Sequence, residues 1–196
     1  DFVELPSQLY EHWLTVPEVL RKHARHVDTD QPIPSQLLNK VLAVRTFDAG
    51  FNAIEYAASA LVDIRSHGLA AAQAAADPLG FEAAVLADLD MPPAITMRHC
   101  TPHFLHVYYG DGYAAGYYSY IWSEVLDADA FAAFEEAGDP FHSETAKRLR
   151  KSVYASGNSM PPEDAYIAFR QRLPSPDAMI AKRGLAPSLN QVGSGT

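Results

Sequence analysis

Short helical patterns, most of them opened by a proline, constrain the fold more than any other feature of the chain. Between residues 34 and 44 the apolar side chains recur at the spacing of one helix face. Proline suits the first turn of a helix, where its missing N–H group is not needed. It stands at five expected helix starts: Pro6, Pro17, Pro34, Pro78 and Pro162. This pattern predicts a mainly α fold.

A few residues are expected to interrupt or restart these helices. We expect Gly50 to break one helix and a later helix to run from Tyr113 to Val125. Either Asp127 or Asp129 is then expected to cap a further helix. The only run that favours a strand is aromatic and apolar, so at most a small β element is expected near residues 103–109.

Composition and charge exclude several classes of protein. A formal net charge of −9 argues against general nucleic-acid binding, which requires a basic surface. No stretch approaches the roughly 20 apolar residues of a membrane helix. The single cysteine, Cys100, suits a reducing compartment such as the cytoplasm. Residues 187–196 are expected to form a disordered tail, and residues 1–186 to form one part of a domain.

A group of tyrosines offers the first candidate site. Tyr113, Tyr117 and Tyr120 are spaced i, i+4 and i+7, which places them on one face of the expected helix. Their hydroxyl groups are neutral donors that could stabilise a developing oxyanion. The alternative interpretation is an aromatic core stripe whose hydroxyls reach the surface.

Histidine and glutamate residues offer candidate metal ligands. His99, His103 and His106 have a possible ligand spacing, but they straddle Pro102 and the strand-like run, so a self-contained metal site is not expected there. The zinc motif His-Glu-x-x-His does not occur in the chain. Glu4 lies among apolar residues just before a helix start, where it could be a buried ligand or a partly exposed carboxylate favoured by the helix dipole.

Two stretches carry a resemblance to a known family. The first is Asp-Phe-Val-Glu-Leu-Pro-Ser-Gln at residues 1–8, followed by Glu11-His12-Trp13. The second is His106 with Gly-Tyr-Ala-Ala-Gly-Tyr-Tyr-Ser-Tyr-Ile-Trp-Ser-Glu-Val at residues 112–125. Together with the C-terminal stretch to Leu185, they resemble the thimet oligopeptidase family, which includes oligopeptidase A and the bacterial peptidyl-dipeptidase Dcp. The chain is most similar to the Dcp-type enzymes.

The resemblance implies the C-terminal, helical portion of a zincin-like (neurolysin-like) catalytic domain that hydrolyses short peptides in the cytoplasm. It implies that Glu4 is the third protein ligand of one zinc ion. It also implies that His106, Tyr113, Tyr117 and Tyr120 bind the peptide and help to stabilise the tetrahedral intermediate. Dcp-type enzymes release C-terminal dipeptides, but the endopeptidase members share the same site, so the mode of cleavage stays open.

The missing motif is the main departure from the family. Two zinc-binding histidines and the general-base glutamate are expected upstream of Glu4, so we expect a fragment that is inactive alone and has the upstream His-Glu-x-x-His part as its partner. Two alternatives stay open: a non-catalytic helical module that binds peptides, and a degenerate relative of the peptidases.

Overall fold

The computed structural model describes residues 2–70 and 76–186, and they are mainly helical, as predicted. The chain divides into two compact units. The first unit contains the residues up to Phe47 and those from Ile121 onward, and the second unit is Asp48–Tyr120. The tail predicted at residues 187–196 lies outside the described residues.

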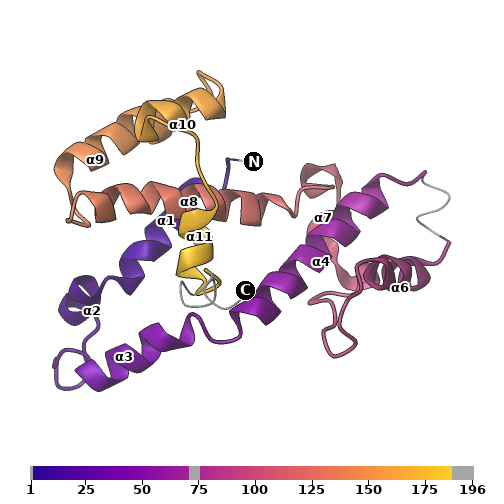
Figure 1. Ribbon diagram of the computed structural model, residues 1–196, viewed down its shortest axis with the longest axis horizontal. Coiled ribbons are helices and arrows are strands. Elements are labelled where there is room, and N and C mark those ends of the chain that lie inside the picture. The colour runs from indigo at the N-terminus through magenta and orange to yellow at the C-terminus, as the bar shows by residue number, and fades with distance from the viewer. Residues whose placement is uncertain (1, 71–75, 187–196) are drawn as a thin grey trace, which may run out of the picture. The chain divides into compact units, whose positions relative to one another are not determined.

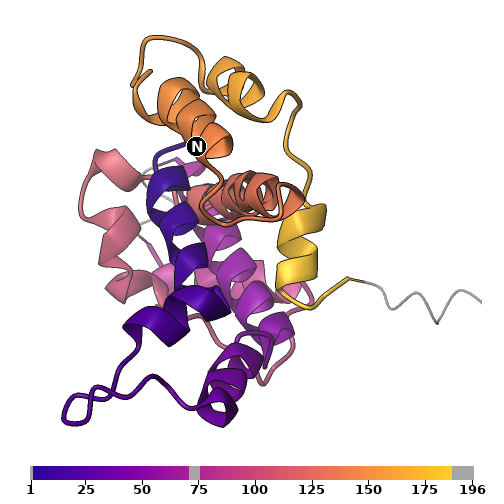
Figure 2. The same cartoon turned by 90° about the vertical axis from the view of Figure 1, so that its left-hand side faces the viewer.

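The first unit is built from short helices around one long helix. The long helix is α8 (Ser119–Glu136), whose first two residues belong to the second unit. The other helices of this unit are α1 (Leu5–Glu11), α2 (Pro17–His23), α3 (Ser35–Val44), α9 (Ser143–Leu149), α10 (Pro162–Arg170) and α11 (Asp177–Lys182). Figures 1 and 2 both show α9 and α10 side by side along α8.

An apolar core joins these helices. Leu5 and Leu9 of α1 are fully buried against Phe131 and Phe134 of α8 and Phe169 of α10. Leu5 and Leu9 are spaced i, i+4, so they share one face of α1. Burying each such side chain contributes about 1.5–3 kcal/mol to the stability of the fold. The packing of α1 therefore fixes where the preceding Glu4 lies within this unit.

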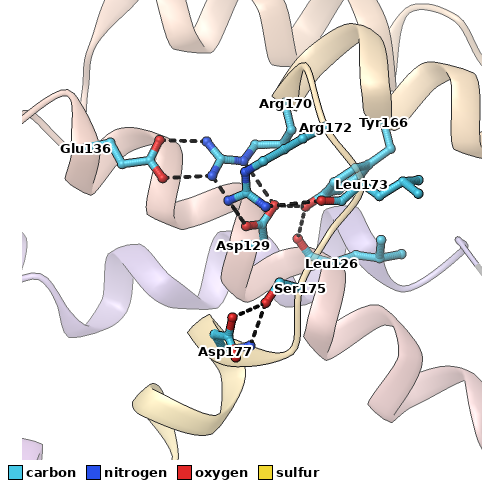
Figure 3. A network of polar contacts seen from close by, with 9 residues as sticks. All are labelled: Leu126, Asp129, Glu136, Tyr166, Arg170, Arg172, Leu173, Ser175 and Asp177. Carbon is cyan, nitrogen blue, oxygen red and sulfur yellow. Dashed lines mark hydrogen bonds and ion pairs between the residues drawn. The ribbon is translucent and has the colours of Figure 1, made fainter.

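The sequence-based assignment of Asp127 or Asp129 as a helix cap is wrong. Both residues lie inside α8, and both are buried. Asp127 pairs with His12 Nε2 at 2.5 Å, while Asp129 accepts hydrogen bonds from Arg170 Nε at 3.0 Å and from the Tyr166 hydroxyl at 2.7 Å. Figure 3 shows this Asp129 network, to which Arg172 also donates. The long-range partners remove the need for a helix end at either position.

The second unit is organised along its longest helix. This helix is α4 (Ala49–His67), and α6 (Pro78–Asp88) packs against it (Figure 1). The break predicted at Gly50 falls instead at Asp48, which adopts a left-handed conformation with φ of +54°. Gly50 lies inside the first turn of α4. A glycine there costs stability, but it does not by itself end a helix.

The strand-like run near residues 103–109, where at most a small β element was expected, contains no strand and includes the short helix α7 (Leu105–Tyr108). Phe104 and Val107 are buried at the i, i+3 spacing of a helix. Residues 2–70 and 76–186 contain no strand to pair with it, only an isolated bridge between Arg25 and Pro32. A lone buried strand would leave its backbone groups without hydrogen bonds. None of the helices in the described ranges has the length and apolar composition to cross a membrane.

Candidate functional site

Within the second unit, three tyrosine rings surround one imidazole. The His106 ring lies 5.1 Å from the ring of Tyr113, 5.6 Å from Tyr117 and 5.8 Å from Tyr120, between ring centroids. The Tyr120 hydroxyl is 3.2 Å from His106 Nε2, within hydrogen-bond reach. The structure thus brings together the four residues that the sequence analysis selected in this region. We call this group the histidine–tyrosine cluster.

The cluster is not assembled on one helix face, so that part of the prediction is wrong. Tyr113 ends a 3₁₀ turn (Asp111–Tyr113), Tyr117 lies in an irregular segment, and Tyr120 lies in the first turn of α8. Ala115 has a left-handed backbone with φ of +54°. At Gly116 an added Cβ atom would lie only 3.0 Å from the carbonyl oxygen of Tyr113. The segment therefore bends where a helix was expected.

The members of the cluster differ in exposure. The Tyr113 residue is 64% exposed, whereas Tyr117 is only 9% exposed. Tyr117 packs against Tyr56 and Phe104, with ring centroids 5.0 Å and 4.8 Å away. The alternative of an aromatic core residue therefore describes Tyr117 well and does not describe Tyr113. His106 is exposed and Tyr120 is partly buried.

Burial further disfavours ionisation of the Tyr117 hydroxyl. Desolvation raises the pKa of Tyr117, and the nearby positive charge of Arg98 opposes this only in part. Arg98 is itself held by Glu55, through an Nη2 to Oε2 contact of 3.0 Å. A phenol with a raised pKa remains a neutral donor across the physiological pH range. The Tyr117 hydroxyl is therefore chemically suited to donate a hydrogen bond to an oxygen acceptor.

Sequence reasoning missed Asp63 of α4, which binds the backbone of the segment that carries Tyr117. Its carboxylate is fully buried and accepts hydrogen bonds from the backbone N–H groups of Tyr117 at 2.9 Å and Ala115 at 3.1 Å. His67 Nδ1 lies 2.8 Å from the same carboxylate. The available signal was an acid within the apolar run Leu61-Val62-Asp63-Ile64, because a buried carboxylate requires partners.

The candidate zinc ligand, Glu4, lies in the first unit and is described separately from the cluster. It occupies the position before α1 and is partly buried. Ser7 is its neighbour one turn later, with its hydroxyl oxygen 2.7 Å from Glu4 Oε2 and 3.0 Å from the Glu4 carbonyl oxygen. The Glu4 carboxylate does not cap α1 by a side-chain hydrogen bond. A carboxylate oxygen such as those of Glu4 can serve as one of the ligands of a zinc ion.

The described residues alone do not fit a zinc ion. Residues 2–70 and 76–186 contain no group of three or more His, Cys, Asp or Glu side chains that could hold a metal. The three spaced histidines have different partners: His99 stacks on Phe104, and His103 Nδ1 lies 3.4 Å from the Cys100 sulfur. The third, His106, belongs to the histidine–tyrosine cluster.

Comparison with known proteins places this chain in a family. The model of peptidase family M3 matches residues 1–185. The dipeptidyl carboxypeptidase of Salmonella typhimurium is 38% identical over 187 residues, which is 94% of this chain and 27% of that protein. Oligopeptidase A of Escherichia coli is 37% identical over 185 residues, again 94% of this chain and 27% of that protein.

The matches also show what share of each relative's length this chain covers. The probable cytosolic oligopeptidase A of Arabidopsis thaliana is 37% identical over 188 residues, with the same shares of 94% and 27%. The chain thus spans about a quarter of the length of these curated relatives. The matches confirm the resemblance to the Dcp and oligopeptidase A group that the sequence indicated. The chain belongs to peptidase family M3.

Proposed function

We propose that this chain is part of a zinc metallopeptidase that hydrolyses short peptides and releases C-terminal dipeptides. The observation that carries the proposal is the histidine–tyrosine cluster, in which the Tyr120 hydroxyl lies 3.2 Å from His106 Nε2. In this proposal, Tyr113, Tyr117, Tyr120 and His106 bind the substrate backbone and donate hydrogen bonds to the developing oxyanion.

The proposal assigns Glu4 as one ligand of a single zinc ion. The other ligands, two histidines of a His-Glu-x-x-His motif, must come from another part of the polypeptide, because this chain has no such motif. Zinc supplies Lewis-acid activation of water and carbonyl groups when it is bound. The proposed compartment is the cytoplasm, with which a single free cysteine is compatible.

Zinc content and product analysis of the full-length protein test this function. We expect about one zinc ion per molecule and release of dipeptides from the C-terminus of a short peptide, both abolished by a chelator and restored by zinc. A matched peptide with an amidated C-terminus separates the two modes of cleavage. Unchanged cleavage of the amidated peptide would favour an endopeptidase over a peptidyl-dipeptidase.

Replacement of Glu4 tests the metal assignment without relying on activity. Glu4→Gln should lower the zinc content, because a neutral amide is a weaker zinc ligand than a carboxylate. The matched control is Glu11→Gln, an exposed residue at the end of the same helix, which should retain full zinc. Full zinc in Glu4→Gln would contradict the assignment. Peptide binding without hydrolysis, unaffected by a chelator, would instead favour the non-catalytic binding module.

A further inference from the structure

The buried carboxylate of Asp63 lies next to the histidine–tyrosine cluster and has no role in the function proposed above. Asp63 has no exposed surface, although it lies on α4 beside the apolar residues Val62 and Ile64. Burying a charge without partners would cost several kcal/mol, so its partners determine what it does. Apart from His67, the donors that contact its two oxygens are main-chain N–H groups.

These donors belong to the segment that carries the tyrosines. Oδ2 accepts the Tyr117 N–H at 2.9 Å, and Oδ1 accepts the Ala115 N–H at 3.1 Å. The carboxylate therefore spans Gly116 and holds the peptide groups on both sides of the bend. Ala115 has φ of +54°, a conformation that costs energy for alanine and needs such outside support.

Helix α4 holds Tyr117 from its other side as well. The Tyr56 hydroxyl donates a hydrogen bond to the carbonyl oxygen of Tyr117. Both main-chain polar groups of Tyr117 are thus bound by side chains of α4, from Tyr56 and Asp63. Tyr120 follows three residues later in the first turn of α8. The position of the bend consequently sets where the Tyr117 and Tyr120 hydroxyls lie.

The same part of α4 also contacts α7, which carries His106. The Tyr108 hydroxyl donates to Ser66 Oγ at 2.7 Å, and Ser66 in turn donates to the Asp63 carbonyl oxygen at 2.8 Å. The His67 ring stacks on the Tyr108 ring, with centroids 5.2 Å apart. The region around Asp63 therefore supports both sides of the histidine–tyrosine cluster.

We propose that Asp63 is a positioning residue of the peptidase site: its carboxylate holds the Ala115 and Tyr117 amides so that the cluster is pre-arranged for the peptide. This inference rests on the proposed function. It predicts a specific consequence of Asp63→Asn, which keeps the size of the side chain. One of the two acceptor oxygens becomes an NH₂ donor that faces a backbone N–H group, so at least one of the two hydrogen bonds is lost.

Backbone amide exchange in the full-length protein tests the structural half of the inference. The Ala115 N–H also lies 3.3 Å from His67 Nδ1, so the Tyr117 amide is the more sensitive reporter. Asp63→Asn should accelerate hydrogen exchange at one or both of the Tyr117 and Ala115 amides by about tenfold or more, because a tenfold change corresponds to about 1.4 kcal/mol, the size of one hydrogen bond. The control is Asp88→Asn in the same unit, an exposed residue that pairs with Arg65 and should leave both amides unchanged. Unchanged exchange in Asp63→Asn would overturn the inference.

Steady-state kinetics test the functional half. Asp63→Asn should lower kcat by up to about a hundredfold with a smaller change in KM, because small displacements of transition-state donors cost that much. The loss should shrink when the same change is made in a Tyr120→Phe background, where the positioned donor is already absent. Equal fold losses in both backgrounds would mean that Asp63 only maintains the fold, and would overturn the positioning role.

A second variant covers the case in which Asp63→Asn does not fold. Asp63→Glu retains the charge and both acceptor oxygens but displaces them by one methylene, so it should also lower kcat more than it changes KM. Unchanged kcat in this variant would overturn the inference. Failure of the proposed function has a different signature, which is absence of zinc-dependent hydrolysis in the unsubstituted protein. The amide exchange would then still report whether Asp63 holds the bend.

Discussion

Two buried aspartates, one in each unit, illustrate how similar residues serve different purposes. Asp63 of α4 is 0% exposed and Asp129 of α8 is 2% exposed. Asp63 binds main-chain N–H groups of one bent segment and the neighbouring His67. Asp129 instead binds Arg170 and Arg172, together with the Tyr166 hydroxyl (Figure 3). The first arrangement fixes a loop, and the second ties separate segments together.

The charged partners of Asp129 explain its structural role. Burial alone would raise the pKa of Asp129, but hydrogen bonds from Arg170, Tyr166 and Arg172 outweigh it and lower the pKa. Arg170 is also bound by Glu136, at 2.9 Å and 2.8 Å, and its pKa is raised mainly by this contact. Such a network stabilises the packing of α8 and α10, whereas the Asp63 contacts control the shape of a candidate site.

The largest effect is expected from removing the charge of Asp129. Asp129→Asn leaves the buried Arg170 with only part of its compensation, and breaking such a pair costs about 3–5 kcal/mol. Native-state hydrogen exchange of α10 in the full-length protein should report a loss of this size. The control is Asp164→Asn, an exposed residue in the first turn of α10. Similar exchange protection of α10 in both variants would contradict the claim that Asp129 stabilises the packing of α10.

Replacing Tyr120 should have the opposite effect from replacing Asp129. It should lower the rate of peptide hydrolysis and leave the stability of the second unit nearly unchanged. Tyr120→Phe retains the ring contact with Tyr117, at 5.6 Å between centroids, and removes only the hydroxyl. Loss of one transition-state donor lowers kcat about a hundredfold, with a smaller change in KM. Tyr109→Phe is the control because Tyr109 is 89% exposed. An unchanged kcat in full-length Tyr120→Phe would contradict its proposed role.

The sequence predicted which residues form the histidine–tyrosine cluster but not how they meet. The spacing of Tyr113, Tyr117 and Tyr120 suggested one helix face, yet the bend at Ala115 and Gly116 places only Tyr120 of the three in an α-helix. A helical spacing cannot reveal that a distant carboxylate binds the amides of the bend. The choice of these residues came from the family resemblance, and their geometry comes from tertiary contacts.

The helices themselves were largely predictable because their signals are local. Pro78 and Pro162 begin α6 and α10 as expected, in the turn where proline is tolerated. The errors occurred where long-range contacts override local preference. Asp127 and Asp129 are favoured at helix starts, but their partners His12 and Arg170 keep them inside α8. Neither partner is recognisable from the sequence around the aspartates.

Acidification should weaken the Asp129 network. The folded pKa of Asp129 is below its ordinary value of 3.8, so the folded state binds fewer protons than the unfolded state at this group. Its stabilising contribution is therefore complete above that ordinary value and is lost as the pH falls through the folded pKa. The difference in α10 opening free energy between unsubstituted protein and Asp129→Asn should shrink at acidic pH. A constant difference between pH 6 and pH 3 would contradict this linkage.

The smallest effect is expected from an exposed ion pair in the second unit, Arg65 with Asp88. Their closest nitrogen and oxygen atoms are 2.6 Å apart, shorter than the 3.0 Å contact of Arg170 Nε with Asp129. The Arg65 and Asp88 side chains are nevertheless 40% and 67% exposed, so water screens the attraction. Such pairs contribute about 0.2–1 kcal/mol.

Asp88→Asn should therefore change the exchange protection of α6 by less than about tenfold, since tenfold corresponds to about 1.4 kcal/mol. The effect should also decrease in high salt, because exposed charges are screened. A loss as large as that of Asp129→Asn would mean that contact distance, and not burial and the number of partners, determines what a carboxylate contributes in this protein. The contrast between Asp63 and Asp129 would then need a different explanation, because it assumes that burial increases the free energy that each hydrogen-bond partner contributes.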